Sequence, residues 1–455
     1  MKKWKVEAKR LGKLKDVSVM VNEIMFFAGE NSSGKTYLLN LLYYFYNYNL
    51  KPGLGVKLIN RNHELKFILD SIEEKQTFTL SPEKINLFLS ELSKELTYNL
   101  KEIKSNVYNS DVLIQKLAIT FEDFKESIKI EFADEKDLMI GGAVGSVSTS
   151  PLGVQYWFRD EIKENINQME KQSVSNSTIS MIIDYLFNRI MYKYIGFEDN
   201  RRFKEGLKSV YLPAGRSTYM LLEKLITKRA YNALTNFEYD DVSQYQLQAN
   251  YGVKSFLNKI VSHSNEYINK YKDLVETIEN DIIGGSFSYN EISKEYQFKP
   301  TGSNRIINIQ AMSSSVTELG AFTESLKLMR GLGKNLVVYE EPESHLHPAK
   351  QIKLMEVLFD FAANNYIWIS SHSDFITQNI NNIVKKKYLD NQLHLADETM
   401  SIYVFEKINT YSTVKKISSS KYGYKVPGFI SFLKAMSKET YRLNEEISKY
   451  EEDNN

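Results

Sequence analysis

The sequence predicts an α/β protein whose central sheet carries a phosphate-binding loop, with a long and largely helical insertion. Three observations support this fold class. A G-x-x-x-x-G-K-[ST] motif at 29–36 joins an apolar strand to an apolar helix. Two further apolar strands, at 335–340 and 366–369, end in acidic residues and beside a histidine. The section from 51 to 205 carries none of these motifs, so it is predicted to be an insertion.

Composition limits the remaining possibilities. A chain of 455 residues is too long for one compact core, so two domains or one core with a large insertion are expected. The net charge of +1 neither requires nor excludes a nucleic-acid partner. The chain has no cysteine, which excludes disulfides, thiolate nucleophiles and cysteine-ligated zinc. Neither a membrane-spanning run nor a signal peptide is found, so a cytoplasmic location without membrane contact is expected.

The motif at 29–36 has the chemistry of a nucleotide site. Backbone N–H groups of such a loop wrap phosphate oxygens at the start of a helix. Lys35 is predicted to contact the β- and γ-phosphates, and the Thr36 hydroxyl to bind a nucleotide-bound Mg²⁺. The alternative is a chance match, but the strand at 23–28 and the helix at 37–42 provide the expected context. The predicted phosphate-binding residues are Gly29, Glu30, Asn31, Ser32, Ser33, Gly34, Lys35 and Thr36.

Apolar alternation predicts antiparallel strands between Trp4 and Ala28, ahead of this loop. In the insertion, Ser81-Pro82 predicts the start of a helix of about 20 residues. Other expected elements are a strand pair at 117–121 and 128–132, a flexible loop at 141–151, and helices up to about 205.

The core is predicted to resume with a short strand at 209–212, followed by a Pro/Gly turn that carries Arg216. Two interpretations of Arg216 stay open: a solvated turn residue, or a residue at the nucleotide edge of the sheet. An amphipathic helix is expected from 252 to 280. Short strands are then expected at 285–289, 296–298 and 306–309.

Three serines, Ser313, Ser314 and Ser315, precede a helix expected at 321–330. Hydroxyls and free N–H groups at a helix start can bind a phosphate. The simpler alternative is a helix cap, for which serine is a common residue.

Glu340 and Glu341 end a buried strand. Acids in such a place are costly to fold unless a cation compensates them, and a Mg²⁺ beside Thr36 would do so. Glu340 is therefore predicted to lie on the magnesium side and Glu341 to polarise the attacking water. The alternative is an ordinary turn with exposed carboxylates. Glu343 has no predicted role.

His372 follows the next apolar strand and could reach the γ-phosphate from there, although a histidine at a strand end is more often structural. An amphipathic helix is predicted between the two strands, around residues 352–362. The six histidines do not show the spacing of a zinc site, so a metalloenzyme is not expected.

The order of these motifs resembles the ABC-type ATPases of the RecF and OLD (overcoming lysogenization defect) group. The matching stretches are Gly29 to Thr36, Ser313 to Leu319, Glu340 to Pro348, and Ser371 to Ser373. The resemblance implies an ABC-type P-loop ATPase head that binds ATP and Mg²⁺ and works as a head-to-tail homodimer or larger homo-oligomer. It also implies that Ser313 to Ser315 contact the neighbour's nucleotide, that Glu341 is the catalytic base, and that His372 is the switch histidine. Two departures are the missing double glycine of transporter signatures and Glu340 in place of an aspartate.

The expected organisation follows from this resemblance. Parts of the ATPase head are predicted at 1–50, 206–235 and 283–440, an insertion arm at 51–205, a helical segment at 236–282, and a disordered acidic tail at 441–455. Only about eighty residues follow His372, without a D-x-D pair, so no TOPRIM nuclease domain is expected. Stand-alone ATPases of this outline look like the ATPase subunits of bacterial anti-phage systems such as PARIS and Septu, in which a separate protein, for example a nuclease, is the effector.

The alternative function is a RecF-like DNA-binding repair or maintenance ATPase. It would use the basic run at the start of the chain, which includes Lys2, Lys3, Lys5, Lys9, Arg10, Lys13 and Lys15. A solvated edge strand is the simpler interpretation of these residues. A transporter ATPase is less well supported, because its signature and coupling glutamine are not found.

Overall fold

The structure is a computed structural model of the whole chain, and it divides into two compact units. One unit comprises residues 1–9, 18–21 and 41–204, and the other comprises 10–17, 22–40 and 205–455. All of the predicted site residues belong to the second unit. The structure describes residues 4–47, 54–73, 78–108, 112–125, 127–133, 137–142, 183, 207–222, 249–261, 268–329, 334–389, 399–420, 423–424 and 437–446.

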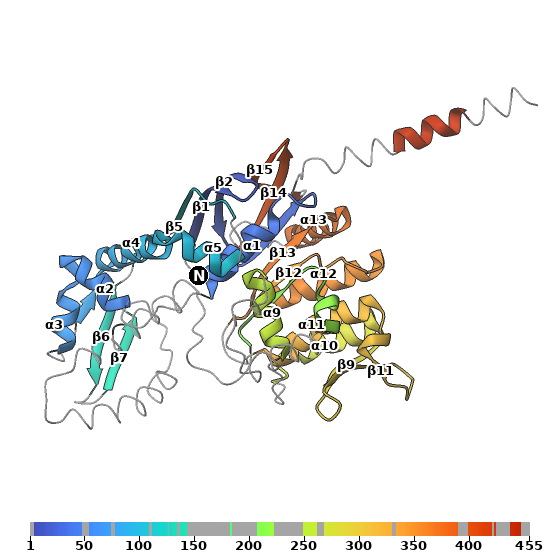
Figure 1. Ribbon diagram of the computed structural model, residues 1–455, viewed down its shortest axis with the longest axis horizontal. Helices are drawn as coiled ribbons and strands as arrows, with labels where there is room; N and C mark the ends of the chain where they lie inside the picture. The colour runs from blue at the N-terminus through green and yellow to red at the C-terminus, as the bar shows by residue number, and fades with distance from the viewer. Residues whose placement is uncertain are drawn as a thin grey trace, which may run out of the picture. The chain divides into compact units, whose positions relative to one another are not determined.

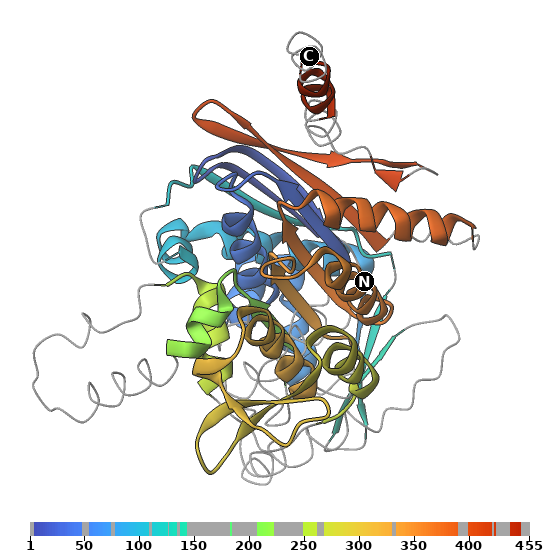
Figure 2. The same ribbon diagram turned by 90° about the vertical axis from the view of Figure 1, so that its right-hand side faces the viewer.

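The largest sheet has nine strands in the order β5-β1-β2-β15-β14-β3-β13-β12-β8, so the fold is α/β with a mixed central sheet (Figure 1). Neighbours from β14 to β8 are parallel, whereas β14 and β15 form the long antiparallel hairpin that Figure 2 shows clearly. The strand bounds are β1 Trp4–Leu11, β2 Leu14–Val21, β3 Ile24–Gly29, β5 Lys116–Phe121, β8 Ser209–Leu212, β12 Leu336–Glu340, β13 Tyr366–Ser371, β14 Met400–Ile408 and β15 Tyr411–Ile417.

The parallel strands are the most buried part of the second unit. All residues of β8, β12 and β13 are buried, and so are five of the six residues of β3. This explains why these strands appear in the sequence as continuous apolar runs, since parallel strands are covered on both faces. Helices and a small sheet pack on them through a core that includes Phe26, Leu212, Phe322, Leu354 and Ile376.

The remaining elements of the second unit cover this sheet or follow it. The small sheet β11-β10-β9 corresponds to the three short strands expected near 285–309. The bounds are α9 Tyr251–Val261, α10 Lys272–Thr277, the π-helix η5 Ile278–Ile283, β9 Gly285–Asn290, β10 Glu295–Pro300, β11 Ile307–Asn308, the 3-10 helix η6 Ile309–Ala311, α11 Ser314–Leu328, α12 Pro348–Ala362, α13 Asp374–Leu389, β16 Ser419–Ser420 and β17 Gly423–Tyr424.

Two predicted helices in this unit have different bounds. The helix expected from 252 to 280 is two helices: α9 ends at Val261, and α10 begins at Lys272 and continues into the π-helix, which ends at the left-handed Gly284. The helix expected at 321–330 begins earlier, at Ser314, because Ser313 accepts a hydrogen bond from the Val316 N–H and caps it.

The described residues of the section predicted as an insertion, 51–205, form helices and a small sheet of order β4-β6-β7. Helix α1 follows the phosphate loop and contributes residues to both units. The bounds are α1 Lys35–Tyr46, α2 Leu54–Arg61, the 3-10 helix η1 His63–Leu65, α3 Phe67–Glu73, β4 Phe78–Leu80, α4 Pro82–Tyr98, α5 Leu100–Tyr108, β6 Ile128–Ala133 and β7 Asp137–Gly142.

Two expectations for the insertion are wrong. The strands at 117–121 and 128–132 do not pair, because β5 pairs with β1 and β6 pairs with β4 and β7. Alternation identifies a strand, but it does not select its partner. The helix of about 20 residues is divided at Asn99, whose side chain accepts a hydrogen bond from the Glu102 N–H and starts α5.

Other expectations fall only partly on described residues. The loop expected at 141–151 begins inside β7, and its remainder lies outside the described residues, as do nearly all of the helices expected up to 205. In the tail, residues 437–446 form a helix, so Glu445 and Glu446 are helical rather than disordered. Arg442 supports this helix with ion pairs to Glu439 and Glu446, both at 2.6 Å. No helix in the described parts of the chain is long and apolar enough to cross a membrane.

Candidate functional site

Four neighbouring strands place the predicted site residues at one edge of the sheet. Strands β3, β13, β12 and β8 are parallel, so their carboxyl ends lie together. In the register, Ala28 is opposite Ser371, and Ser370 is opposite Glu340. The phosphate loop, His372, the acid pair and the Arg216 turn therefore follow strands that end side by side.

The loop from Gly29 to Gly34 has the backbone of an anion-binding turn. Gly29, Ser32 and Gly34 have φ values of +149°, +58° and +102°. Positive φ values of this kind are typical of tight glycine-containing turns such as phosphate-binding loops. The two glycines are also required sterically: a Cβ on Gly29 would lie 2.5 Å from the Phe405 carbonyl oxygen, and one on Gly34 would lie 2.8 Å from the Leu14 side chain.

Lys35 is almost completely buried at the first turn of α1. Its Nζ donates to the carbonyl oxygens of Gly29, at 2.6 Å, and Glu30, at 2.7 Å. Burial lowers the pKa of Lys35 to about 8, although the charges of Glu341, Glu343 and Glu340 oppose this effect. An ammonium group desolvated to this extent gains strongly from an added anion.

Glu340 is buried between the loop and strand β8. One carboxylate oxygen accepts a hydrogen bond from the Tyr211 hydroxyl, and the other accepts one from the Ala214 N–H at 3.4 Å. Burial raises the pKa of Glu340, while hydrogen bonds, including one from Thr36, lower it. A Thr hydroxyl and a desolvated carboxylate are hard oxygen ligands, so this pair fits a magnesium ion.

Glu341 has an unusual backbone. Its φ is +46°, the left-handed region that a non-glycine residue rarely adopts. Its N–H donates to the Ser370 carbonyl at 2.8 Å, and its carboxylate lies 3.7 Å from the His372 Nδ1 and accepts a hydrogen bond from the Ser344 hydroxyl at 3.4 Å. The Glu341 side chain is about one-third exposed, so it can contact water.

Glu343 is a site residue to which the sequence gave no role. Its carboxylate is 7% exposed, and Oε1 accepts hydrogen bonds from the Ser371 hydroxyl at 2.6 Å and the His372 N–H at 3.2 Å. Its Oε2 is buried and has no hydrogen-bond partner among the residues that the structure describes. Glu343 therefore fixes the backbone that carries His372. The available signal was its place two residues after the acid pair.

Arg216 is fully buried, which excludes a solvated turn residue. It lies at the edge of the sheet that carries Glu340 and Glu341, but it is buried inside the protein below these acids. Its side chain forms an ion pair with Glu318 at 2.9 Å. Its Nη1 donates to the carbonyl oxygens of Pro213 and Glu340, both at 2.9 Å. Arg216 thus supports the site from below, and the sequence did not indicate Glu318 as its partner.

The three serines lie apart from the acids. Ser313 caps α11, its hydroxyl is 3.1 Å from that of Ser315, and Ser313 and Ser314 are exposed. Among the described residues, they form no hydrogen bond with the phosphate loop, Glu340 or Glu341. A contact between these serines and a nucleotide therefore stays a prediction that requires a second subunit.

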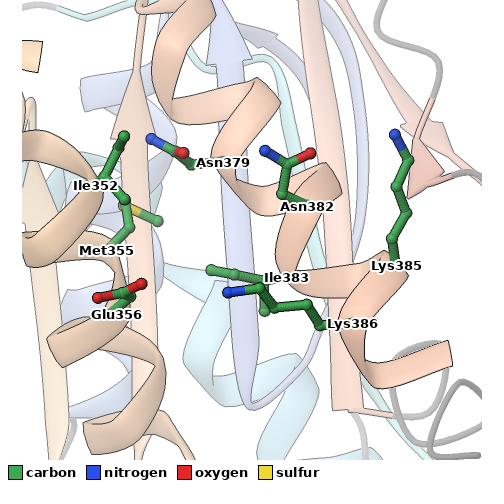
Figure 3. Close-up of a pocket in the computed structure, with 8 residues that line it drawn as sticks. All are labelled: Ile352, Met355, Glu356, Asn379, Asn382, Ile383, Lys385 and Lys386. Carbon is green, nitrogen blue, oxygen red and sulfur yellow. The ribbon is translucent and has the colours of Figure 1, made fainter. Parts of the chain in front are cut away.

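A separate cavity of about 360 Å³ lies between α12 and α13. Its lining residues come from these two helices, as Figure 3 shows, with Ile352 and Met355 on one side and Asn379, Ile383, Lys385 and Lys386 on the other. None of the predicted site residues lines it. The cavity is therefore not part of the strand edge that carries the acids.

Comparison with known proteins gives one family. A family model described as AAA ATPase domain matches residues 1–377. No curated protein sequence matches the chain.

Similar solved structures are heads of SMC proteins. One, an SMC head bound to the C-terminal winged-helix domain of ScpA, is 13% identical, with 92% of this chain and 98% of that chain covered and a TM-score of 0.35. A second, an SMC head with an extended coiled coil from Pyrococcus furiosus, is 11% identical, with 98% of both chains covered and a TM-score of 0.35. The SMC head domain from Thermotoga maritima is 9% identical, with 92% and 100% covered and a TM-score of 0.33.

Proposed function

This chain belongs to the family described as AAA ATPase domain, and we propose that it binds ATP with Mg²⁺ at the sheet edge formed by β3, β13, β12 and β8 and hydrolyses it there. The observation that carries the proposal is the convergence of two distant segments. Lys35 and Thr36 of the phosphate loop lie within electrostatic or hydrogen-bonding reach of Glu340 and Glu341. A chance motif match would explain the phosphate loop alone, and an ordinary turn would explain the acids alone. Their proximity is what a site for a triphosphate and its magnesium ion requires.

We assign each residue a role in ATP binding or hydrolysis from its environment. Lys35 and the loop N–H groups would bind the β- and γ-phosphates, while Thr36 and Glu340 would hold the magnesium ion. When bound, the ion would neutralise charge on the phosphate oxygens. Glu341 is more exposed than Glu340, which supports a role in orienting and polarising the attacking water. The His372 Nδ1 lies 3.7 Å from the Glu341 carboxylate, and His372 would contact the γ-phosphate from there.

The role of Glu341 is tested by Glu341→Gln. We expect this variant to bind ATP with nearly unchanged affinity and to lose turnover by about 100-fold or more, because the carboxylate acts only on the water. Glu356→Gln is the matched control, since Glu356 is an exposed acid in the separate cavity between α12 and α13. Hydrolysis by Glu341→Gln at the wild-type rate would refute the assignment.

A shared site between two subunits is the second part of the proposal. Ser314 is exposed beside the cap and is suited to contact a nucleotide held by another copy. Lys35→Ala disables the phosphate loop with which a subunit binds its own ATP. Ser314→Arg blocks the serine surface with which a subunit contacts the ATP of its neighbour. A mixture of the two inactive variants then contains one intact site per mixed dimer, so activity should return. A mixture that stays inactive would refute the shared site.

The biological role proposed for this ATPase is a nucleotide-driven switch in an anti-phage system that controls a separate effector protein. The order of the motifs supports this role through the resemblance given above, and so does a long insertion without ATP motifs. The test is purification of the Glu341→Gln variant with and without ATP from cells that also express the neighbouring gene product. An effector that copurifies only in one nucleotide state is expected, and equal recovery in both states would contradict a switch.

DNA binding is the alternative, supported by exposed cations near the turn between β1 and β2. Lys9, Arg10, Lys13 and Lys15 are exposed, while Lys5 is engaged with Glu7 at 2.5 Å. Binding to a DNA backbone would weaken steeply as salt rises, because each phosphate contact releases counterions. A weaker binding with a shallower salt dependence in Lys13→Glu would support the alternative, and no binding at low salt would refute it.

A further inference from the structure

The buried ion pair between Arg216 and Glu318 joins two parts of the molecule with different predicted tasks. Glu318 lies on α11, whose first turn carries the three serines. Arg216 follows strand β8 and reaches the end of β12, where the acids lie. The exposed fractions of the two side chains are 0% and 1%, so the pair is shielded from solvent.

The contacts of Arg216 are directed at the backbone of the acids. Its Nη1 donates to the Glu340 carbonyl at 2.9 Å, and its Nη2 donates to the Glu341 carbonyl at 3.4 Å. The guanidinium also lies 4.5 Å from the centre of the Tyr339 ring. One side chain therefore contacts three consecutive residues at the end of β12.

These contacts bear on the strained part of the site. Glu341 has a φ of +46°, and such a residue keeps this conformation only where its surroundings fix it. The Ser370 carbonyl holds the Glu341 N–H from one side, and Arg216 holds its carbonyl from the other. The direction of the Glu341 carboxylate therefore depends on Arg216.

The other end of the pair is equally well held. Arg216 Nε lies 2.9 Å from the Glu318 Oε2 and also donates to the Glu318 carbonyl at 3.2 Å. The second carboxylate oxygen accepts a hydrogen bond from the Ser217 hydroxyl at 2.7 Å. Phe322, one turn further along α11, packs on Tyr339 with ring centres 5.2 Å apart. The first half of α11 is thus fixed to the end of β12.

Stability alone does not explain a charge pair in this place. Desolvation of two ions offsets most of their attraction, and apolar replacements of such pairs are often as stable or more stable. The best attested use of a buried pair is to fix one geometry among several.

We propose that the Arg216–Glu318 pair is a positioning device that locks the end of β12 to the first turns of α11. Glu340 and Glu341 act on the subunit's own nucleotide, and Ser313 to Ser315 contact the nucleotide of the neighbouring subunit. The ion pair makes these two groups move as one rigid body. This inference rests on the proposed shared ATP site and adds residues that couple its two halves. Arg216 and Glu318 act through other residues and are not catalytic.

The test uses the mixed dimer described above, which has one working site. In that site the Ser314→Arg subunit supplies the loop and acids, and the Lys35→Ala subunit supplies the serines. Glu318→Gln is added to one subunit at a time. It keeps the size of the side chain and an oxygen that can accept from Ser217, while it removes the charge that holds Arg216.

We expect kcat at saturating ATP to fall by roughly tenfold or more in both placements, because small displacements of reacting groups are costly. The KM for ATP should change less, since Lys35 and the loop are untouched in the working site. Arg216→Lys should lower kcat as well, although it keeps the positive charge. An ammonium group cannot contact Glu318 and two carbonyls at once as the forked guanidinium does.

Glu279→Gln is the matched control. Glu279, on the π-helix η5, forms an ion pair at 3.0 Å with Lys327 at the other end of α11, so this variant also weakens a largely buried pair that involves the same helix. It should lower the melting temperature and leave kcat unchanged.

Each outcome is decisive. A fall in kcat in both placements, but not in the control, supports the coupling. An unchanged kcat in either placement overturns it, and so does an equal loss in the control. If the mixture is inactive before Glu318→Gln is added, the shared site itself fails and the inference falls with it.

Discussion

Lys35 should make the stability of the protein depend on pH in a way that one substitution can isolate. Burial lowers its pKa to about 8 in the folded chain, against 10.5 for an ordinary lysine. Below pH 8 the amine is charged in both states, so the folded state carries the whole cost of desolvation. Between pH 8 and 10.5 the folded amine loses its proton before the unfolded one does. The contribution of Lys35 to stability therefore rises with pH across this window.

The size of the effect follows from the difference between the two pKa values. A difference of 2.5, from 10.5 minus 8, corresponds to about 3 kcal/mol of destabilisation below pH 8. About 2 kcal/mol of this cost is relieved by pH 9.5, where the folded amine is neutral and the unfolded one is still mostly charged.

The assay is urea unfolding of the wild type and Lys35→Met, without nucleotide, at pH 7 and pH 9.5. Methionine does not titrate, so subtraction removes the contribution of other groups. The wild type should gain about 2 kcal/mol relative to the variant between the two pH values. Lys334→Met is the control, because Lys334 is half-exposed and the burial argument does not apply to it. A change of less than about 0.5 kcal/mol between the two pH values, in the unfolding free energy of the wild type relative to Lys35→Met, would refute the burial argument.

Three further predictions concern single residues. Glu343→Ala should lower kcat about tenfold with little change in ATP affinity, because the Ser371 hydroxyl and the His372 N–H lose their acceptor. Glu343→Gln should have an intermediate kcat, and equal kcat values for the wild type and both variants would contradict the positioning role. Gly34→Ala should destabilise the protein by about 1–3 kcal/mol and abolish ATP binding, measured by thermal unfolding and calorimetry, since the residue has a φ of +102° and its Cβ would meet Leu14. Asn40→Ala should cost about 1–3 kcal/mol in urea unfolding, because it leaves the buried Gly252 N–H without its acceptor at 2.7 Å; an unchanged midpoint would show that water replaces the amide.

The sequence was most informative where one segment carries both a motif and its structural context. The loop from Gly29 to Thr36 lies between a strand and a helix, as predicted, and its glycines have the backbone that the motif requires. The apolar runs before Glu340 and His372 are buried parallel strands. These features are local, because continuous burial on both faces gives an apolar run whatever the partner strand is.

Pairing between distant segments could not be predicted in the same way. Strand β5 resembles β6 in its alternation, yet it pairs with β1, more than a hundred residues away. Helix ends were also displaced where one polar side chain decided them, as Ser313 does for α11 and Asn99 does for α5. Alternation and period identify an element, whereas its partners depend on what else in the chain needs to be covered.

The sequence by itself determined that this chain carries a phosphate-binding loop, an acid pair and a histidine, each at the end of a buried strand. Only the tertiary structure decided that Arg216 is buried under the acids, that Glu318 is its partner, and that Glu343 holds His372. The reason is physical. A motif is set by neighbouring residues along the chain, but the burial and charge partners of a side chain are set by segments that folding brings together from far apart in sequence.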